Sequence, residues 1–406
     1  MKRFFSLLAA AVLLLALMGC SKKNSGINGQ NRPVELVIWH DKEDAVAAAL
    51  QTELDKLRPG IVVRMERKNG LTEALKMVGN DPKAAPDFYF FAHDKLGIYA
   101  EMGILTPITD LIDSDVIGAF LPITISAATY KGKIYQLPIY FETLLFMYNR
   151  ALMKDDKVPA TTEELYAFIV SGSGGKYGFI EQHSTAYYSA GWIHGFGGSI
   201  IRDDGTPLLN TPETIKALEY HKKFVRMMPG ESEYATVNTL FREGKAASTI
   251  GGPWLVPTVK ESGINLGLAK IPAIDETGLP IAPYSGVQGL HVLKVAADNQ
   301  IKKDAIKEVL NLLLKTDIGV AMAKASGCAP ALEACYQMDE VKNNEMVMMM
   351  RETAETAVPM PNIPEMDVMW NVVGNLLVDV NMRGVDVSKA VAEAQKKAED
   401  LIRAMK

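Results

Sequence analysis

The segment from Pro86 to Leu105 reads PDFYFFAHDKLGIYAEMGIL and joins an apolar aromatic run to a charged turn. Phe88 to Phe91 are predicted to form a buried strand, and Gly97 to Met102 are predicted to start a helix. Ala92-His93-Asp94-Lys95 form the turn between them. Because open α/β sheets bind ligands at the carboxyl ends of their strands, this turn is a candidate site, with an ordinary charged loop as the alternative.

The chain before this segment alternates between strand and helix patterns. The predicted elements are the strand Val34 to Trp39, the helix Asp44 to Leu57, the strand Ile61 to Arg64 and the helix Thr72 to Val78. Each helical pattern ends before the next strand pattern begins. Strands that alternate with helices in this way predict a parallel α/β layer.

The chain after this segment continues with strand and helix patterns. Phe141 to Asn149 are predicted to form a strand that contains Glu142, a carboxylate that is costly to bury without a partner. Ala246 to Ile250 are predicted to form a second buried strand. The predicted helices are Thr161 to Ile169, Thr211 to Met227, Tyr234 to Glu243, Asn299 to Leu314, a helix capped by Thr316 that stops at Gly327, and Ser388 to Lys406.

The first residues predict export and lipidation. Residues 1–19 form the expected signal peptide, because Lys2 and Arg3 precede an apolar run that is too short for a comfortable membrane span. Leu17-Met18-Gly19-Cys20 resembles a bacterial lipobox, in which the cysteine becomes the lipidated first residue. Residues 20–33 are then a flexible, lipidated tether. Plain secretion, with Cys20 a bystander, is the alternative.

Composition limits the classes of partner and fold. The formal charge is −5, and it becomes −7 when Lys2 and Arg3 are cleaved off, with no basic block to compensate. Nucleic acid is therefore not an expected partner. About 370 residues remain, which predicts two domains rather than one core. Export permits a disulfide between Cys328 and Cys335, and two free thiols are the equal alternative.

Motifs of common enzyme classes are missing from the sequence. It has no G-x-S-x-G elbow, no H-E-x-x-H, no Walker loop, no dinucleotide fingerprint and no Cys/His cluster with metal spacing. We therefore expect no catalysis, no metal and no cofactor. Because two carboxylates suffice for a glycosidase, a glycan-processing enzyme with Asp94 and Glu142 as acid and base is kept as an alternative.

Aromatic residues gather near glycines and prolines. Tyr187, Tyr188 and Trp192 precede a Gly-Phe-Gly-Gly stretch, Trp254 follows Gly-Gly-Pro, and Trp370 follows Met-Pro-Asn-Ile-Pro. Glycine and proline at these points predict that the rings project from loops. Aromatic faces beside carboxylates suit a sugar, whose C–H face stacks and whose hydroxyls donate. Core packing is the alternative for each ring.

Ordered motifs over nearly the whole mature chain resemble the maltose-binding protein family, the solute receptors of ABC importers. The motifs are LVIW at 36–39, the segment at 86–105, YKGKIYQLPIYFETLLFMYN at 130–149, GGPW at 251–254, LLLKTDIG at 312–319 and MPNIPEMDVMW at 360–370. The resemblance implies a type II periplasmic binding protein fold, with two α/β lobes around a hinged ligand cleft. The implied N-terminal lobe is 34–140 plus 290–338, and the implied C-terminal lobe is 141–289 plus 339–406.

The resemblance also implies a function. We expect a monomeric, lipid-anchored receptor outside a membrane, on the periplasmic or cell-surface side. It would capture an oligosaccharide similar to maltose or maltodextrin and deliver it to the permease of an ABC importer. A receptor of the same fold for a different sugar or solute, or an adhesin-like surface lipoprotein, is the alternative.

The ligand-binding residues that the resemblance implies come from both lobes. They are Asp41, Lys42, Phe91, Asp94, Lys95, Glu142, Tyr187, Trp254 and Trp370. Asp94 and Glu142 match acceptors of sugar hydroxyls, Tyr187 matches a tyrosine that stacks and hydrogen-bonds, and the two tryptophans match stacking residues. His93 is expected to be structural.

The chain departs from the family pattern at several of these positions. Phe91 stands where the family has tryptophan, Lys95 where it has arginine, and Thr185 where it has a carboxylate. Phenylalanine stacks without an N–H, and lysine lacks the planar fork of arginine. Asp41 and Lys42 are taken as the Asp-Lys pair that follows the first strand, with Glu43 and Asp44 as the alternatives. These departures keep an oligosaccharide as the expected ligand and leave its identity open.

Overall fold

The computed structural model describes residues 33–405 except 173–174. The predicted signal peptide and the lipidation site Cys20 lie outside the described residues. Among the helices that are described, none is both long enough and apolar enough to cross a membrane.

A larger mixed sheet has the strand order β12-β7-β11-β3-β1-β2, and β4 and β13 pair with β11. Its strands are β1 (Val34–His40), β2 (Ile61–Arg67), β3 (Phe88–Ala92), β4 (Leu105–Thr106), β7 (Gln136–Thr143), β11 (Tyr284–Leu293), β12 (Ala329–Pro330) and β13 (Val358–Pro359). β1 pairs in parallel with both β2 and β3, which confirms the predicted parallel layer. β11 runs antiparallel to β3 and β7.

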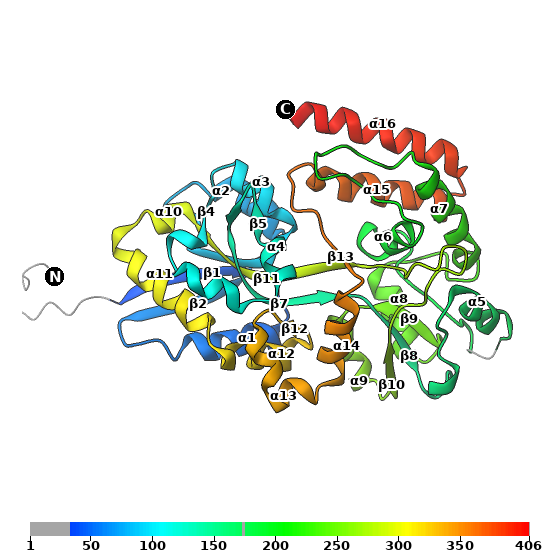
Figure 1. The fold of residues 1–406 in the computed structure, drawn as a ribbon, viewed down its shortest axis with the longest axis horizontal. Helices are drawn as coiled ribbons and strands as arrows, with labels where there is room; N and C mark the ends of the chain where they lie inside the picture. The colour runs from blue at the N-terminus through cyan, green and yellow to red at the C-terminus, as the bar shows by residue number, and fades with distance from the viewer. Residues whose placement is uncertain (1–32, 173–174, 406) are drawn as a thin grey trace, which may run out of the picture. The chain divides into compact units, whose positions relative to one another are not determined.

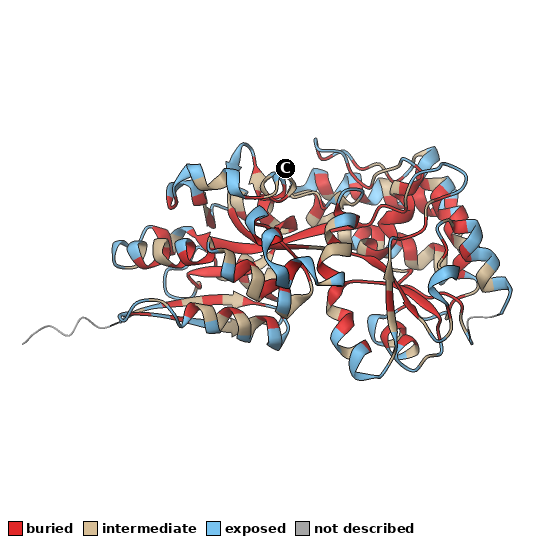
Figure 2. Cartoon of the chain, turned by 60° about the horizontal axis from the view of Figure 1, so that its bottom comes forward, coloured by how far each residue is buried: buried red, intermediate tan, exposed pale blue. Residues whose placement is uncertain are grey.

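Helices cover both faces of this sheet, and the alternation of side chains along β3 assigns each residue to a face. Phe88 and Phe90 join the core formed with α1 (Asp44–Leu54), α11 (Gln300–Leu313) and α12 (Thr316–Ser326). Tyr89 points the other way, into a cluster with α2 (Leu71–Val78) and α3 (Leu96–Glu101). Because side chains alternate along a strand, Phe91 shares the face of Tyr89. Figure 2 shows these strands buried between helices whose outer faces are exposed.

The predicted strand Phe141 to Asn149 is split in two at Leu144. Its first residues end β7, which stays paired with β11 in the larger sheet, side by side in Figure 1. The rest form β8 (Leu145–Asn149), which lies between β9 (Ser248–Gly251) and β10 (Leu266–Ala269) in a smaller sheet. The prediction of one strand was wrong because an uninterrupted apolar run carries no signal for a change of sheet.

A second core packs one face of the smaller sheet against helices. It contains residues of α6 (Ala186–Gly195), α7 (Pro212–Val225), α15 (Met366–Asn381) and α16 (Val387–Met405). α15 and α16 run side by side along this core (Figure 1). The remaining elements are β5 (Thr129–Tyr130), β6 (Lys133–Ile134), α4 (Pro122–Ala127), α5 (Thr162–Val170), α8 (Tyr234–Arg242), α9 (Val256–Glu261), α10 (Lys294–Ala297), α13 (Asp339–Lys342), α14 (Glu345–Ala354) and the 3-10 helices η1 (His93–Lys95), η2 (Ile108–Asp110), η3 (Ser114–Ala119), η4 (Asp155–Lys157), η5 (Pro253–Leu255) and η6 (Glu333–Gln337).

Several helix ends follow the signals in the sequence. The Thr211 side chain accepts a hydrogen bond from the backbone N–H of Thr214 and precedes α7, and Asn299 caps α11 in the same manner. Gly327 ends α12 with φ of 70°, a left-handed conformation that favours glycine. Thr316 is the first residue of α12 rather than its cap, so the prediction of its capping role was wrong; Lys315 precedes the helix without a side-chain cap.

The prediction that the aromatic residues project from loops was wrong for most of them. Tyr187, Tyr188 and Trp192 lie within α6, and Trp370 lies within α15. Trp192 is fully buried, so for this ring the core-packing alternative holds. Trp254 lies in the short helix η5. The glycines and prolines mark helix ends, and the rings project from helices.

His93 joins β3 to two other segments of the chain. Its ring is fully buried. Nδ1 accepts a hydrogen bond of 3.0 Å from the backbone N–H of Val287 in β11, so Nε2 carries the proton and donates across 2.8 Å to the carbonyl of Met360. Both nitrogens of a neutral imidazole are thus satisfied, which gives His93 a structural role.

We predict that His93→Ala lowers the free energy of unfolding by roughly 2–5 kcal/mol, because it leaves a buried N–H and a buried carbonyl without partners. Burial lowers the pKa of His93 below 6.5. The contribution of His93 is therefore present above pH 6.5 and is lost as the pH falls below that value. Urea unfolding at several pH values measures both effects. Met77→Ala, at a side chain that is 84% exposed, is the control and should change stability by less than about 0.5 kcal/mol. An equal loss at pH 8 and pH 5 would contradict the account.

Candidate functional site

One cavity of about 520 Å³ brings together seven of the nine predicted ligand-binding residues. Its lining contains Phe91, Asp94, Lys95, Glu142, Tyr187, Trp254 and Trp370, together with Thr72, Glu73, Ala92, Met360, Asp367 and Asn371. These residues come from α2, β3, η1, β7, α6, η5 and α15 and from the segment that contains Met360. Strands β3 and β7 of the larger sheet, helices that cover this sheet and helices of the second core therefore build the walls.

A second cavity of about 490 Å³ contains the other two predicted residues, Asp41 and Lys42. Glu142 and Trp254 line both cavities, so the two adjoin. Glu43 and Asp44 also line the second cavity. All the residues considered for the Asp-Lys pair therefore line this second cavity.

Glu142 is held through an amide rather than by a direct ion pair. Gln288 on β11 donates from Nε2 to Glu142 Oε1 across 2.6 Å, and its Oε1 accepts from Lys42 Nζ across 2.9 Å. Lys42 also pairs with Asp41 at 2.7 Å. Burial raises the pKa of Glu142, while Lys42 and the bond from Gln288 oppose that rise. Gln288 was missed by the sequence analysis.

Two of the aromatic residues in the cavity, Tyr187 and Trp370, share a buried support. Tyr187 lies 6.3 Å from Trp254 and 6.5 Å from Tyr284, measured between ring centroids. Tyr284 lies 5.7 Å from Trp370, with the rings nearly perpendicular. Tyr284 is almost completely buried at the start of β11. This tyrosine, which the sequence analysis also missed, supports the rings of Tyr187 and Trp370, and Tyr187 in turn lies against Trp254.

Asp94 and Tyr187 are polar residues of the cavity lining. The indole N–H of Trp370 donates to Asp94 Oδ2 across 3.2 Å, and Lys95 Nζ lies 3.4 Å from the same oxygen. The hydroxyl of Tyr187 is buried and has no hydrogen-bond partner among the described residues. An unpartnered hydroxyl in the wall of a cavity suits a ligand that both donates and accepts. Phe91, another ring of the site, has the ammonium group of Lys42 over its face, with Nζ 5.3 Å from the ring centroid.

Cys328 and Cys335 are free, buried thiols in the structure. Of the two alternatives, the structure therefore contains the free thiols and not the disulfide. Cys328 Sγ lies 3.7 Å from Glu142 Oε2, whereas Cys335 Sγ contacts the carbonyl of Thr316 at 3.5 Å. The two side chains thus have separate partners. Burial raises the pKa of both thiols, that of Cys335 to about 11, so neither is a reactive thiolate at neutral pH.

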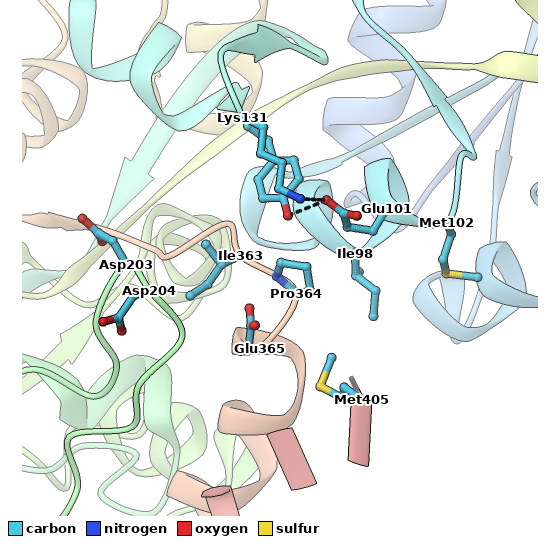
Figure 3. A pocket seen from close by; sticks show the side chains of 11 residues that line it. Ile98, Glu101, Met102, Lys131, Asp203, Asp204, Ile363, Pro364, Glu365 and Met405 are labelled. Atoms are coloured by element: carbon cyan, nitrogen blue, oxygen red, sulfur yellow. Dashed lines mark hydrogen bonds and ion pairs between the residues drawn. The ribbon is translucent and has the colours of Figure 1, made fainter. Parts of the chain in front are cut away.

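A larger cavity of about 780 Å³ has a different chemistry. Figure 3 shows Glu101, Asp203, Asp204 and Glu365 around it, with Lys131 and an aromatic ring bonded to Glu101. That ring belongs to Tyr130, whose hydroxyl donates to Glu101 across 2.8 Å. This cavity lacks the several aromatic faces of the smaller one. Within the part of the chain that the structure describes, no three His, Cys, Asp or Glu side chains are arranged to hold a metal ion.

Comparison with protein families and with individual proteins gives one consistent result. A family model described as bacterial extracellular solute-binding protein matches residues 46–349. The maltotriose-binding protein of Pyrococcus abyssi is 31% identical over 83% of this chain and 75% of its own length. The galactooligosaccharide-binding protein of Bacillus subtilis is 28% identical over 98% and 97%. A maltooligosaccharide ABC transporter solute-binding lipoprotein of Streptococcus pneumoniae is 26% identical over 95% and 93%.

Solved structures give the same architecture. The maltose/maltodextrin-binding domain of Bdellovibrio bacteriovorus, bound to maltotriose, superimposes with a TM-score of 0.80 at 26% identity, over 91% of this chain and all of that domain. This likeness confirms the predicted type II periplasmic binding protein fold, with two α/β lobes around a cleft.

We predict that Glu142→Gln separates stability from binding. The raised pKa of Glu142 means that its ionised form is unfavourable in the fold, so the neutral variant should unfold at a higher temperature than the wild type at pH 7. This gain should vanish as the pH falls to the ordinary glutamate value of 4.5, where the wild type is protonated as well. Affinity for an oligosaccharide should fall by about 1.5–3 kcal/mol, because a charged acceptor is lost. Thermal unfolding without ligand and calorimetric titration with maltotriose measure the two effects; a variant that melts lower and binds as well as the wild type would contradict the assignment.

Proposed function

Because this chain belongs to the family of bacterial extracellular solute-binding proteins, we propose that it is a receptor that captures an oligosaccharide between its two lobes. A maltodextrin-like sugar is the favoured ligand, and an ABC importer is the proposed recipient. The observation that carries the proposal is the cavity in which Phe91, Trp254 and Trp370 lie around the carboxylates of Asp94 and Glu142.

The chemistry of this cavity supports a sugar. The axial C–H groups of a hexose ring stack on aromatic faces, and its hydroxyl groups need acceptors and donors at the edge. Glu142 and Asp94 offer carboxylate acceptors, Lys95 offers donors, and the hydroxyl of Tyr187 is free to do both. The adjoining second cavity gives room for more than one sugar unit. Asp41 and Lys42 are the proposed contacts there.

The connection between the lobes supports closure around the ligand. We propose the boundaries 34–140 plus 290–338 for one lobe and 141–289 plus 339–406 for the other. β7 leads toward the smaller sheet through Leu144, and β11 runs antiparallel beside it. A ligand shifts the equilibrium toward the closed form only as far as it binds that form better. Residues of both proposed lobes line one cavity, so a ligand bound there would contact both lobes.

We further propose export and a lipid anchor at Cys20, which would hold a monomeric receptor outside the membrane near its permease. The lipobox-like sequence motivates the anchor. The relative from Streptococcus pneumoniae that is named a lipoprotein of an ABC transporter supports it. Mass spectrometry of the protein from its native membrane tests the anchor: a diacylglycerol on Cys20 is expected, and an unmodified residue there would refute it.

The identity of the sugar has a competing answer. The relative from Bacillus subtilis is named for binding galacto-oligosaccharides, and it covers more of this chain than the maltotriose-binding relative. Thr185 and Lys95 depart from the maltose pattern, which also keeps this competitor open. The proposed lack of catalysis is tested separately: after prolonged incubation a receptor releases its oligosaccharide unchanged, whereas a glycan-processing enzyme yields products.

Calorimetric titration against maltose, maltotriose, maltotetraose, trehalose and galacto-oligosaccharides tests the proposed function. A dissociation constant in the micromolar range, about −8 kcal/mol, is expected for a receptor that must also release its ligand. Folded protein that binds none of these sugars would overturn the proposal.

We predict that Trp254→Ala and Trp370→Ala each weaken binding of the preferred oligosaccharide by roughly 1–3 kcal/mol, by analogy with aromatic stacking on planar groups. Trp192→Phe is the matched control. Trp192 is buried in the same lobe, and its indole N–H donates to Glu181 across 3.1 Å. The control should lower the melting temperature and leave the dissociation constant unchanged. If Trp254→Ala and Trp370→Ala bound the sugar with the same dissociation constant as the wild type and the control, the two cavity tryptophans would not be sugar platforms.

A further inference from the structure

An ion-pair network lies in one wall of the cavity. Its central member, Asp367, lines the cavity but is not one of the proposed sugar contacts. Asp367 Oδ1 accepts from Lys95 Nζ across 2.9 Å, and Oδ2 accepts from Lys76 Nζ across 2.7 Å. Lys95 also lies 3.4 Å from Asp94, and Lys76 lies 3.1 Å from Glu73. The network therefore consists of two lysines and three carboxylates.

The members of this network belong to opposite sides of the cavity. Lys76 lies in α2 and Lys95 in η1, both of which cover the larger sheet. Asp367 lies in the first turn of α15, whose apolar side packs in the core of the smaller sheet. It precedes Trp370 by three residues, so the carboxylate and the indole share one face of the helix. The pairing of Asp367 with the two lysines thus joins the two sides of the cavity.

Three charged groups of the network are largely shielded from solvent, so their interactions are stronger than those of exposed ion pairs. The side chains of Lys95, Asp367 and Lys76 are 12%, 18% and 21% exposed. Burial alone would raise the pKa of Asp367, but the bonds from Lys76 and Lys95 outweigh it and hold this pKa below its ordinary value. Asp367 is therefore ionised at neutral pH, and both of its oxygens are committed to the lysines.

The geometry points to Asp367 as a specificity-determining and positioning residue that makes the cavity select neutral oligosaccharides, an inference that rests on the proposed function. The ammonium group of Lys95 has three N–H donors. One of them is donated to Asp367, the Asp94 carboxylate lies 3.4 Å away, and Lys95 lines the cavity, so at least one N–H remains for a hydroxyl or ring oxygen of the ligand. Asp367 thereby fixes the direction of that donor.

The same pairing excludes acidic sugars. The positive charges of Lys76 and Lys95 are already compensated by Asp367, Asp94 and Glu73. A uronic acid or a sulfated sugar would have to displace Asp367 from the lysines or lie beside it as a like charge, and either is unfavourable. A neutral hydroxyl needs neither change. Removing the charge of Asp367 should therefore relax the exclusion.

The decisive experiment compares Asp367→Asn with the wild type. Dissociation constants are measured by calorimetry for two neutral trisaccharides, maltotriose and galactotriose, and for the acidic trigalacturonate. The variant should bind the better neutral sugar more weakly and trigalacturonate more tightly, so that the ratio of the acidic to the neutral dissociation constant falls at least about tenfold. Asp379→Asn is the matched control. Asp379 lies on the same helix, pairs with Arg383 across 2.7 Å and does not line this cavity. Its ratio should equal that of the wild type.

A double-mutant cycle tests whether Asp367 acts through Lys95. In the Lys95→Gln background, Asp367→Asn should weaken neutral sugar binding much less than it does alone. Full additivity of the two changes, or an unchanged ratio of the acidic to the neutral dissociation constant in Asp367→Asn, overturns this inference while the proposed function stands. A wild type that binds neither neutral sugar overturns both, so the two failures are distinguishable.

Discussion

The antiparallel pairing of β7 with β11 is the constraint on which the site depends. β11 is buried along its whole length, and its register with β7 shifts between Gln288 and Gly289, where Pro138 on β7 has no N–H to donate. A Cβ atom at Gly289 would lie 2.4 Å from the carbonyl of Leu137, so only glycine permits this close approach. Gln288 and Glu142 then fall on the same face of neighbouring strands, where their side chains meet.

The remaining features of the site build on this pairing. Gln288 accepts a hydrogen bond from Lys42 and donates one to Glu142, so it links these two side chains. Tyr284, four residues earlier on the same strand, supports Tyr187 and Trp370. His93 fastens the end of β3 to the same strand. One strand therefore aligns the carboxylate, the aromatic faces and the charged turn. Such prearranged polar and aromatic groups favour recognition, and Glu142 and Asp94 each accept a hydrogen bond from a neighbouring side chain.

Local patterns in the sequence were enough for the parallel layer and for the turn at Asp94, because both depend on neighbouring residues. They were insufficient where a long-range contact decides. Leu144 divides one apolar run between two sheets, and Tyr187 lies in a helix whose residues face a core on most sides, so neither has a periodic signal. Gln288 and Asp367 were missed because their roles come from partners more than 140 residues away along the chain. Asp367 did carry a local signal, its spacing of three residues from Trp370 on a helix, which places both on one face.

The most direct measurement is a crystal structure of the mature protein with the oligosaccharide that it binds best. The account predicts a sugar in the cavity between the two lobes, with its rings stacked on Phe91, Trp254 and Trp370 and with Glu142 within hydrogen-bond distance of a hydroxyl. A sugar bound elsewhere, such as in the larger acidic cavity beside Glu101 and Glu365, with these aromatic faces unoccupied, would contradict it.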